Sequence, residues 1–174
     1  MSGKPGQRLA ACSSTPAWPR TTLLLVFGLL VSGSALEAQT PGRKFINPPG
    51  LTKPSGYTHV VVSADGRTAY VAGQVAFDST GNVVGAGDFQ VQAEQVFANL
   101  RRALASVGAS FGDVVKTTTF ITDLKNIPAL RDTRARYFDS IHPPANSLIP
   151  VAALARPELL LEIEAVVDLP RRDR

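Results

Sequence analysis

Cysteine is almost absent from this chain, which has 174 residues and one thiol, at Cys12. Cys12 lies in a segment that we expect to be removed, so the mature protein has neither a disulfide nor a zinc site built from cysteine. Histidine is nearly as scarce, because His59 and His142 are the only two. No acid or cysteine stands at metal-ligand spacing from either of them. A zinc hydrolase and a histidine-dependent nuclease are therefore poorly supported, and no metal or other cofactor is expected.

An excess of charge of one sign is also lacking once the two ends are set aside. The whole chain carries 18 basic and 14 acidic residues. Residues 1–38 and the basic tail 171–174 each remove three bases and one acid, which leaves 12 of each. A neutral core lacks the basic stripe that binding to nucleic-acid phosphates requires. The sequence also lacks a phosphate-cradling glycine loop and a nucleophile elbow, so we expect no nucleic-acid partner.

No apolar run is long enough to span a bilayer, which takes roughly 20 residues. The run at residues 23–31 is shorter, follows three basic residues and precedes the small residues 32–35. These are the marks of a secretory signal peptide. We expect residues 1–38 to be cleaved, after Ala38 or Ala35, so that the mature protein is periplasmic or secreted and has no membrane contact. The alternative is a wrongly assigned start on a cytoplasmic protein, because basic leaders this long are unusual.

The rest of the chain indicates a single α+β domain. Residues 39–56 are rich in Pro, Gly and Lys and are expected to form an extended arm, followed by the domain at 57–170. Asp65-Gly66 separates two apolar runs and predicts a β-hairpin, because glycine accepts the positive φ of such turns. A second turn is expected at residues 79–82.

Two helices are predicted. Asp88 is a good N-cap for the first, Gly108 ends it, and its apolar residues recur at helical spacing. Its polar face is predicted to carry Gln92, Glu94, Arg101 and Arg102. Asn126 is expected to cap the second helix, with Pro128 in its first turn. The predicted inner face of that helix consists of Ile127, Leu130, Tyr137, Phe138 and Ile141.

The remaining strands complete the order β-β-α-β-α-β-β, with both helices on one face of the sheet. They are expected at residues 113–121, 147–151 and 159–167. Residues 60–62 and 159–161 are apolar on both faces, so the face without helices also needs a cover. An oligomer meets this need, and the alternative is a small monomeric sandwich.

Residues 142–168 resemble the C-terminal signature of the RidA/YjgF family, whose best-known members hydrolyse reactive enamines and imines. Shorter sequence motifs of the family recur in order at residues 73–75, 113–118, 122–124 and 162–165. No single motif is specific for the family, but the order and spacing of the motifs together are. The resemblance implies a chorismate-mutase-like fold with a mixed sheet and a homotrimer with three clefts between neighbouring subunits.

The resemblance also implies roles for particular residues. Glu162 matches a cleft carboxylate that orients the hydrolytic water or moves a proton, and Tyr57 matches a cleft tyrosine. Ala72-Gly73 stands where deaminases commonly have Ser-Gly, so the hydroxyl is missing while the close backbone approach remains. From the residues alone, Glu162 and Glu164 share one face of a strand, and a solvated strand face is the plain alternative. For Tyr57 the alternative is an aromatic ring that closes the edge of the core.

Asn146 is the main departure from the family pattern. It stands, beside Ser147, where deaminating members have an arginine that grips the substrate carboxylate. A neutral amide bond is weaker than the charge-assisted bonds of a guanidinium, by enough to lower affinity about tenfold to several hundredfold. Arg134, on the expected second helix, and Arg156 are candidates for a compensating cation. Each has an ordinary alternative as a solvated surface residue.

Three functions from different classes remain open. The first is a cofactor-free hydrolase of small imines or enamines, with Glu162 and Asn146 as catalytic residues. In it, Tyr57, Ala72, Gly73, Ser147 and Arg134 bind the substrate. The second is a non-catalytic trimer that binds a small metabolite in the same cleft, and the third is an interaction or chaperone-like protein. Retention of Glu162 favours chemistry and loss of the arginine favours binding, and we rank the hydrolase first.

Overall fold

The computed structural model describes residues 42–170, which form one six-stranded sheet with two α-helices. The expected signal peptide with its cut sites, and the basic tail, lie outside the described residues. The elements are β1 Lys44–Ile46, β2 Val60–Val62, β3 Thr68–Gln74, α1 Phe89–Ala105, β4 Val114–Ile121, α2 Ile127–Arg134, β5 Ala145–Pro150 and β6 Leu161–Asp168. Two short 3-10 turns, Phe111–Asp113 and Leu124–Asn126, precede β4 and α2.

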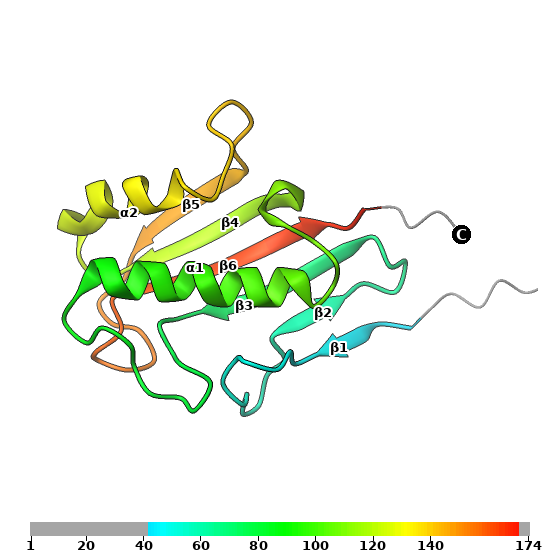
Figure 1. The fold of residues 1–174 in the computed structure, drawn as a ribbon, viewed down its shortest axis with the longest axis horizontal. Coiled ribbons are helices and arrows are strands. Elements are labelled where there is room, and N and C mark those ends of the chain that lie inside the picture. The colour runs from blue at the N-terminus through cyan, green and yellow to red at the C-terminus, as the bar shows by residue number, and fades with distance from the viewer. Residues whose placement is uncertain (1–41, 171–174) are drawn as a thin grey trace, which may run out of the picture. The chain divides into compact units, whose positions relative to one another are not determined.

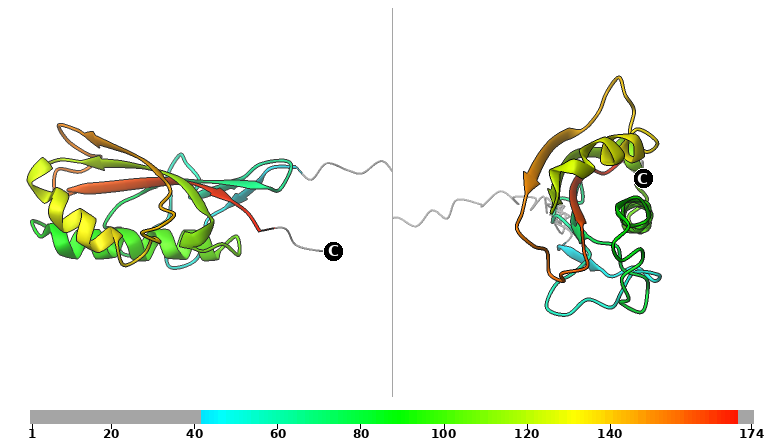
Figure 2. Two further views of the ribbon diagram at one scale, coloured as in Figure 1. Left: turned by 90° about the horizontal axis from the view of Figure 1, so that it is seen from above. Right: turned by 90° about the vertical axis from the view of Figure 1, so that its left-hand side faces the viewer.

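The strand order is β1-β2-β3-β6-β4-β5. All neighbouring strands are antiparallel except β4 and β5, which are parallel and joined by the connection that contains α2. Both helices lie on the same face of the sheet (Figures 1 and 2), which confirms the predicted α+β class and helix placement. The sheet has one strand more than predicted, because β1 forms within the expected arm and pairs with β2.

Local signals in the sequence place several elements correctly. The hairpin turns at Gly66, where φ is 71°, and the Ser63 amide donates to the Thr68 carbonyl across it. The Asp88 side chain caps α1 by accepting a hydrogen bond from the Val91 amide. Turn and cap chemistry of this kind acts within a few residues, so it can be recognised without tertiary information.

Two expectations about the helices are wrong. Gln92 was expected on the polar face of α1 but is fully buried, and its amide bonds the backbone of Gly85, Glu158 and Leu160. Buried loops need such partners for their backbone groups. Ile141, expected on the inner face of the second helix, is 78% exposed because α2 ends at Arg134. Asn126 precedes α2 as predicted, but its side chain makes no capping hydrogen bond.

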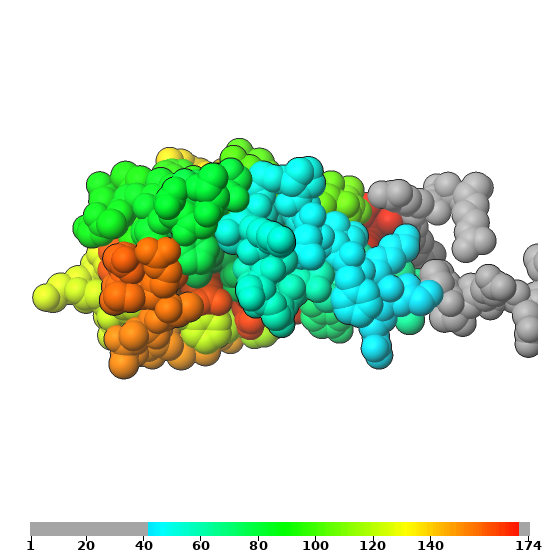
Figure 3. Space-filling view, turned by 90° about the horizontal axis from the view of Figure 1, so that it is seen from below, coloured from blue at the N-terminus to red at the C-terminus, as the bar shows by residue number. Residues whose placement is uncertain are grey.

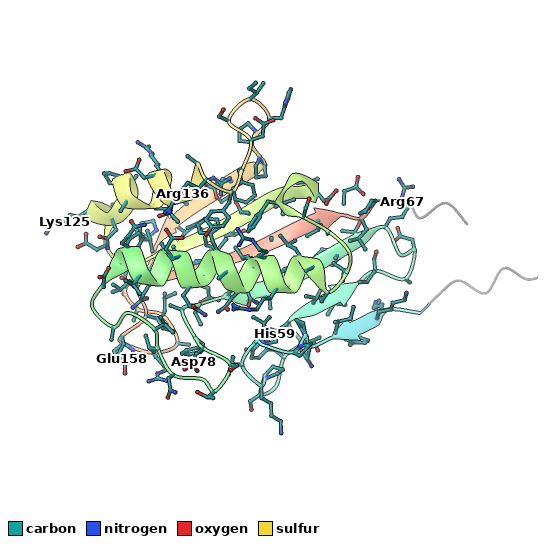
Figure 4. The ribbon with its side chains drawn as sticks, viewed as in Figure 1. His59, Arg67, Asp78, Lys125, Arg136 and Glu158 are labelled. Atoms are coloured by element: carbon teal, nitrogen blue, oxygen red, sulfur yellow. The ribbon has the colours of Figure 1, made fainter. Side chains whose placement is uncertain are left out.

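Two loops at one end of the sheet lie side by side (Figures 3 and 4). Arg156 donates to the Gly81 carbonyl, forms an ion pair with Glu158 and lies over the Phe77 ring at 5.5 Å. Asp78 accepts hydrogen bonds from the amides of Thr80 and Asn82 and orders the neighbouring turn. Arg156 therefore has a structural role here. No helix within residues 42–170 has the length and apolarity to cross a membrane.

The two faces of the sheet differ sharply, and this difference positions the candidate site. On the helix face, alternate residues of β4 and β6, such as Ile121, Leu161 and Ile163, are fully buried in the core. The opposite face, which we call the open face, has no helix over it. Tyr70 is 54% exposed there. A hollow of about 290 Å³ in the open face is lined in part by Tyr70 and Lys116.

Candidate functional site

Glu162 lies in β6 on the open face, between the buried residues Leu161 and Ile163. Its register partner on β4 is Phe120. The carboxyl group is half-buried and forms no hydrogen bond with any residue of the described chain. Burial raises the pKa of Glu162, and the nearby Glu164 carboxylate raises it further. A carboxyl group with a raised pKa and free oxygens can exchange protons with a ligand.

The backbone of β3 approaches this carboxyl group at Gly73. A methyl group placed on Gly73 would lie only 2.7 Å from Cδ of Glu162 and still closer to one carboxylate oxygen. The pairing between β3 and β6 is irregular between Val71 and Gln74, so Ala72 and Gly73 fall at a bulge. Bulges re-aim side chains and are frequent beside binding sites. The structure thus brings Gly73 and Glu162 together.

Tyr57 completes this group. It precedes β2, and its side chain is 46% exposed. Burial raises the pKa of the Tyr57 phenol, as does the negative charge of Glu162 nearby. The Tyr57 ring meets the His59 ring edge-on, with 5.2 Å between ring centroids. Tyr57, Gly73 and Glu162 are named below the carboxyl cluster.

His59 supports the carboxyl cluster from the interior, and sequence reasoning missed it. It is 3% exposed and lies near the start of β2 (Figure 4). Nε2 lies 2.8 Å from the Thr52 carbonyl oxygen, which accepts only, so this nitrogen carries hydrogen. Nδ1 then accepts from the Gln74 amide at 3.3 Å. The His59 ring, held from both sides by Thr52 and Gln74, supports the Tyr57 ring that packs against it.

Replacing Gly73 with alanine is expected to lower activity without unfolding the protein. Gly73 has no positive φ, so alanine adds no backbone strain, and the group in the way is the mobile end of Glu162. The carboxyl group must therefore turn away from β3. We expect at least a tenfold loss of any Glu162-dependent rate, with the free energy of unfolding changed by less than about 1 kcal/mol. Turnover and urea unfolding measured together test this. Gly112→Ala is the control, because a methyl group there makes only an ordinary van der Waals contact with Ser110, at 3.5 Å.

Asn146 lies on the other face of the sheet. Its register partner is the buried Thr117, so its side chain points toward the helix side. The Asn146 Oδ1 atom accepts hydrogen bonds from Thr117 at 2.8 Å and from Thr119 at 3.1 Å. Arg134, at the end of α2, donates to Thr117 Oγ1 at 3.1 Å. The structure therefore brings Asn146 and Arg134 together, but separately from the carboxyl cluster.

The remaining predicted site residues lie on or near the open face. Ser147 is opposite Thr118, and its hydroxyl accepts a hydrogen bond from Lys116 at 3.1 Å. Ala72 lines the open-face hollow together with Lys116 and Glu164. Two further participants, Thr117 and Lys116, carried no signal in the sequence beyond strand propensity. Within residues 42–170, no cluster of three or more His, Cys, Asp or Glu side chains could bind a metal.

Comparisons with known proteins agree with this architecture. The family model described as Endoribonuclease L-PSP matches residues 51–169. A RutC family protein of Synechocystis is 36% identical over 73% of this chain and 97% of its own length. A 2-iminobutanoate/2-iminopropanoate deaminase of Dermatophagoides farinae is 31% identical over 72% of this chain and 95% of its own length.

The fold is shared with solved structures as well. The crystal structure of E. coli TdcF with bound serine superposes with a TM-score of 0.64 at 27% identity, covering 72% of this chain and 98% of that one. The same family is indicated by the mixed sheet with two helices, by the family-model match and by the relatives. This chain belongs to the RidA/YjgF family, whose family model carries the description Endoribonuclease L-PSP.

Proposed function

We propose that this protein is a cofactor-free hydrolase of small imines or enamines that acts in clefts between subunits. One observation carries the proposal: Glu162 is a half-buried carboxyl group with a raised pKa, no hydrogen-bond partner in the described chain, and direct contact with the Gly73 backbone. Partnerless half-buried carboxyl groups are unfavourable for folding, so a carboxyl group of this kind favours a role in chemistry.

The reaction needs two proton transfers and no redox step. Water adds to the imine carbon, the carbon–nitrogen bond breaks, and the products are a ketone and ammonia. Ionised Glu162 takes a proton from the attacking water and gives it to the imine nitrogen, which forms a carbinolamine. Glu162 then takes the hydroxyl proton of the carbinolamine and gives it to the amino nitrogen, so that the carbonyl group forms as ammonia leaves. The Tyr57 phenol, whose pKa is raised, stays protonated and donates one hydrogen bond to the substrate.

A complete cleft requires two subunits. Glu162 lies on the open face, whereas Asn146 lies on the helix face of the edge strand β5. The two side chains of one chain therefore cannot contact the same small molecule. If the open face of one subunit meets the β5 edge of the next, both reach one ligand. A homotrimer of this kind is consistent with the family and also covers the open-face hollow.

Two relatives support a small polar substrate. One is named as a deaminase of 2-iminobutanoate and 2-iminopropanoate, and the TdcF structure contains serine. A second candidate function is a trimer that binds a small metabolite without turnover, favoured by the neutral Asn146 in place of the arginine. A chaperone-like role on the outer surface ranks third. The neutral core disfavours the RNA cleavage that the family model's description suggests.

The proposal is tested by hydrolysis of 2-iminobutanoate, with the natural chain compared to an Asn146→Arg variant. We expect the natural chain to accelerate hydrolysis above the spontaneous rate. If only the arginine variant is active, the cleft is intact but serves another ligand, and the metabolite-binding function takes first place. If neither accelerates the reaction, the hydrolase proposal fails.

A further inference from the structure

Arg134 is a half-buried cation without a counter-ion among residues 42–170. No carboxylate of the described chain lies within 4 Å of its guanidinium, and burial lowers the pKa of Arg134 from its ordinary value. The guanidinium carbon lies 4.4 Å from the centre of the Phe138 ring, which fixes the plane of the group. Removing a charge from water without a partner is unfavourable, so buried charges are normally paired.

Other arginines of the described chain show the ordinary arrangement. Arg136, between α1 and α2 in Figure 4, forms an ion pair with Glu94, and Arg156 forms one with Glu158. These pairs are largely exposed, where solvent screens the charge. Arg134 differs in both respects, because it is more buried and lacks the partner. Four of its five N–H donors have no acceptor within residues 42–170.

The hydrogen bonds around Thr117 fix the orientation of Asn146. The Thr117 hydroxyl accepts from Arg134, so its own hydrogen is free to be donated to Asn146 Oδ1. Thr119 donates to the same oxygen. The Asn146 oxygen therefore accepts two hydrogen bonds from side chains of β4, and the two N–H donors of Nδ2 remain available to a ligand. Arg134 and Asn146 together present only hydrogen-bond donors and one positive charge.

We propose that Arg134 and Asn146 form a binding subsite for the carboxylate of a small 2-imino or 2-oxo acid, at the β5 edge of the sheet. The positive charge comes from α2, and Thr117 links it to the neutral amide on β5. This inference rests on the proposed function for the choice of ligand. The subsite itself depends only on the geometry of Arg134, Thr117 and Asn146.

The test is the affinity of the purified protein for 2-oxobutanoate, the product of the proposed reaction, measured by isothermal titration calorimetry. Arg134→Gln is expected to weaken binding about ten- to a hundredfold, because charge-assisted bonds are lost. Arg134→Lys should restore part of the affinity, since lysine keeps the charge but not the planar fork. Arg131→Gln is the matched control on the same helix, where the side chain is exposed. The uncharged 2-oxobutanamide should bind weakly and equally to all variants.

The outcomes separate this inference from the proposed function. Affinity for 2-oxobutanoate that depends on Arg134, in a protein without hydrolase activity, supports the subsite and overturns only the hydrolase. If Arg134 only stabilises the fold by packing on the Phe138 ring, Arg134→Gln should lower thermal stability and leave the affinity for 2-oxobutanoate unchanged. This result overturns the subsite. Absence of saturable 2-oxobutanoate binding by the natural protein overturns it too. Asn146→Asp provides a second variant. Its carboxylate should pair with the Arg134 guanidinium in place of the ligand carboxylate and so abolish binding.

Discussion

Glu162→Gln is expected to lower the rate of imine hydrolysis by about 10²–10⁴-fold, the usual contribution of a general acid–base group. Glutamine has nearly the same shape and still fits against Gly73, so the fold and the ligand affinity should be retained. It cannot take a proton from water. A steady-state assay should therefore show the loss in kcat, with the affinity for 2-oxobutanoate changed little. Glu164→Gln is the matched control on the same strand face, and a loss of equal size there would contradict the assignment.

The same variant should differ from the natural protein in the pH dependence of stability. The pKa of folded Glu162 lies above its ordinary value, so ionisation disfavours the folded state. The stabilisation associated with the neutral form is complete below the unfolded pKa and is lost as pH rises through the folded pKa. Glutamine does not ionise, so the variant gains stability relative to the natural chain as pH rises from about 4 to about 8. Urea unfolding at both pH values checks the sign, and activity should rise with pH over the same window.

Mixed trimers of two inactive variants are expected to regain activity. Glu162→Gln disables the open-face side of a cleft, and Asn146→Asp repels the substrate carboxylate from the β5 side. If each cleft takes Glu162 from one subunit and Asn146 from its neighbour, random mixing leaves about a quarter of the clefts intact. Co-expression of the two chains in equal amounts should therefore raise turnover from near zero to about a quarter of the natural rate.

The control for this experiment mixes Glu162→Gln with Glu162→Ala. Both variants damage the same side of the cleft, so no cleft is restored and turnover should stay near zero. If the Glu162→Gln and Asn146→Asp mixture also stays inactive although the trimers form, the two residues do not serve one site across a subunit boundary. This result would overturn the proposal that neighbouring subunits share a cleft, but not the proposal that the carboxyl cluster is catalytic.

Much of the fold follows from signals that act over a few residues. The Asp88 cap, the glycine at Gly66 and the alternation around Glu162 predicted helix α1, the first hairpin and the face of β6. These features depend on backbone conformation and on burying one side of an element, which a local pattern records. The family resemblance then supplied the arrangement of these elements.

Features that depend on contacts distant in sequence were harder to predict. Gln92 looks like a solvated residue of an amphipathic helix, but its amide is needed by the Gly85 and Glu158 loops, 7 and 66 residues away. Strand β1 forms only because β2 offers an edge for pairing. The early end of α2 leaves Ile141 exposed, although the helical spacing of apolar residues continues past Arg134.

For the site, the sequence by itself determined the chemical groups: a carboxyl group at Glu162, a residue without a side chain at Gly73 and a neutral amide at Asn146. The tertiary structure decided their distribution, because strand register sets which face of the sheet each side chain occupies. It placed Glu162 and Asn146 on opposite faces, and it linked Asn146 through Thr117 to Arg134 on α2. The physical reason is that β5, unlike β6, shows no alternation of buried and exposed residues. The pairing of β5 with β4 therefore decides the face of Asn146, and a shift of one residue would reverse it.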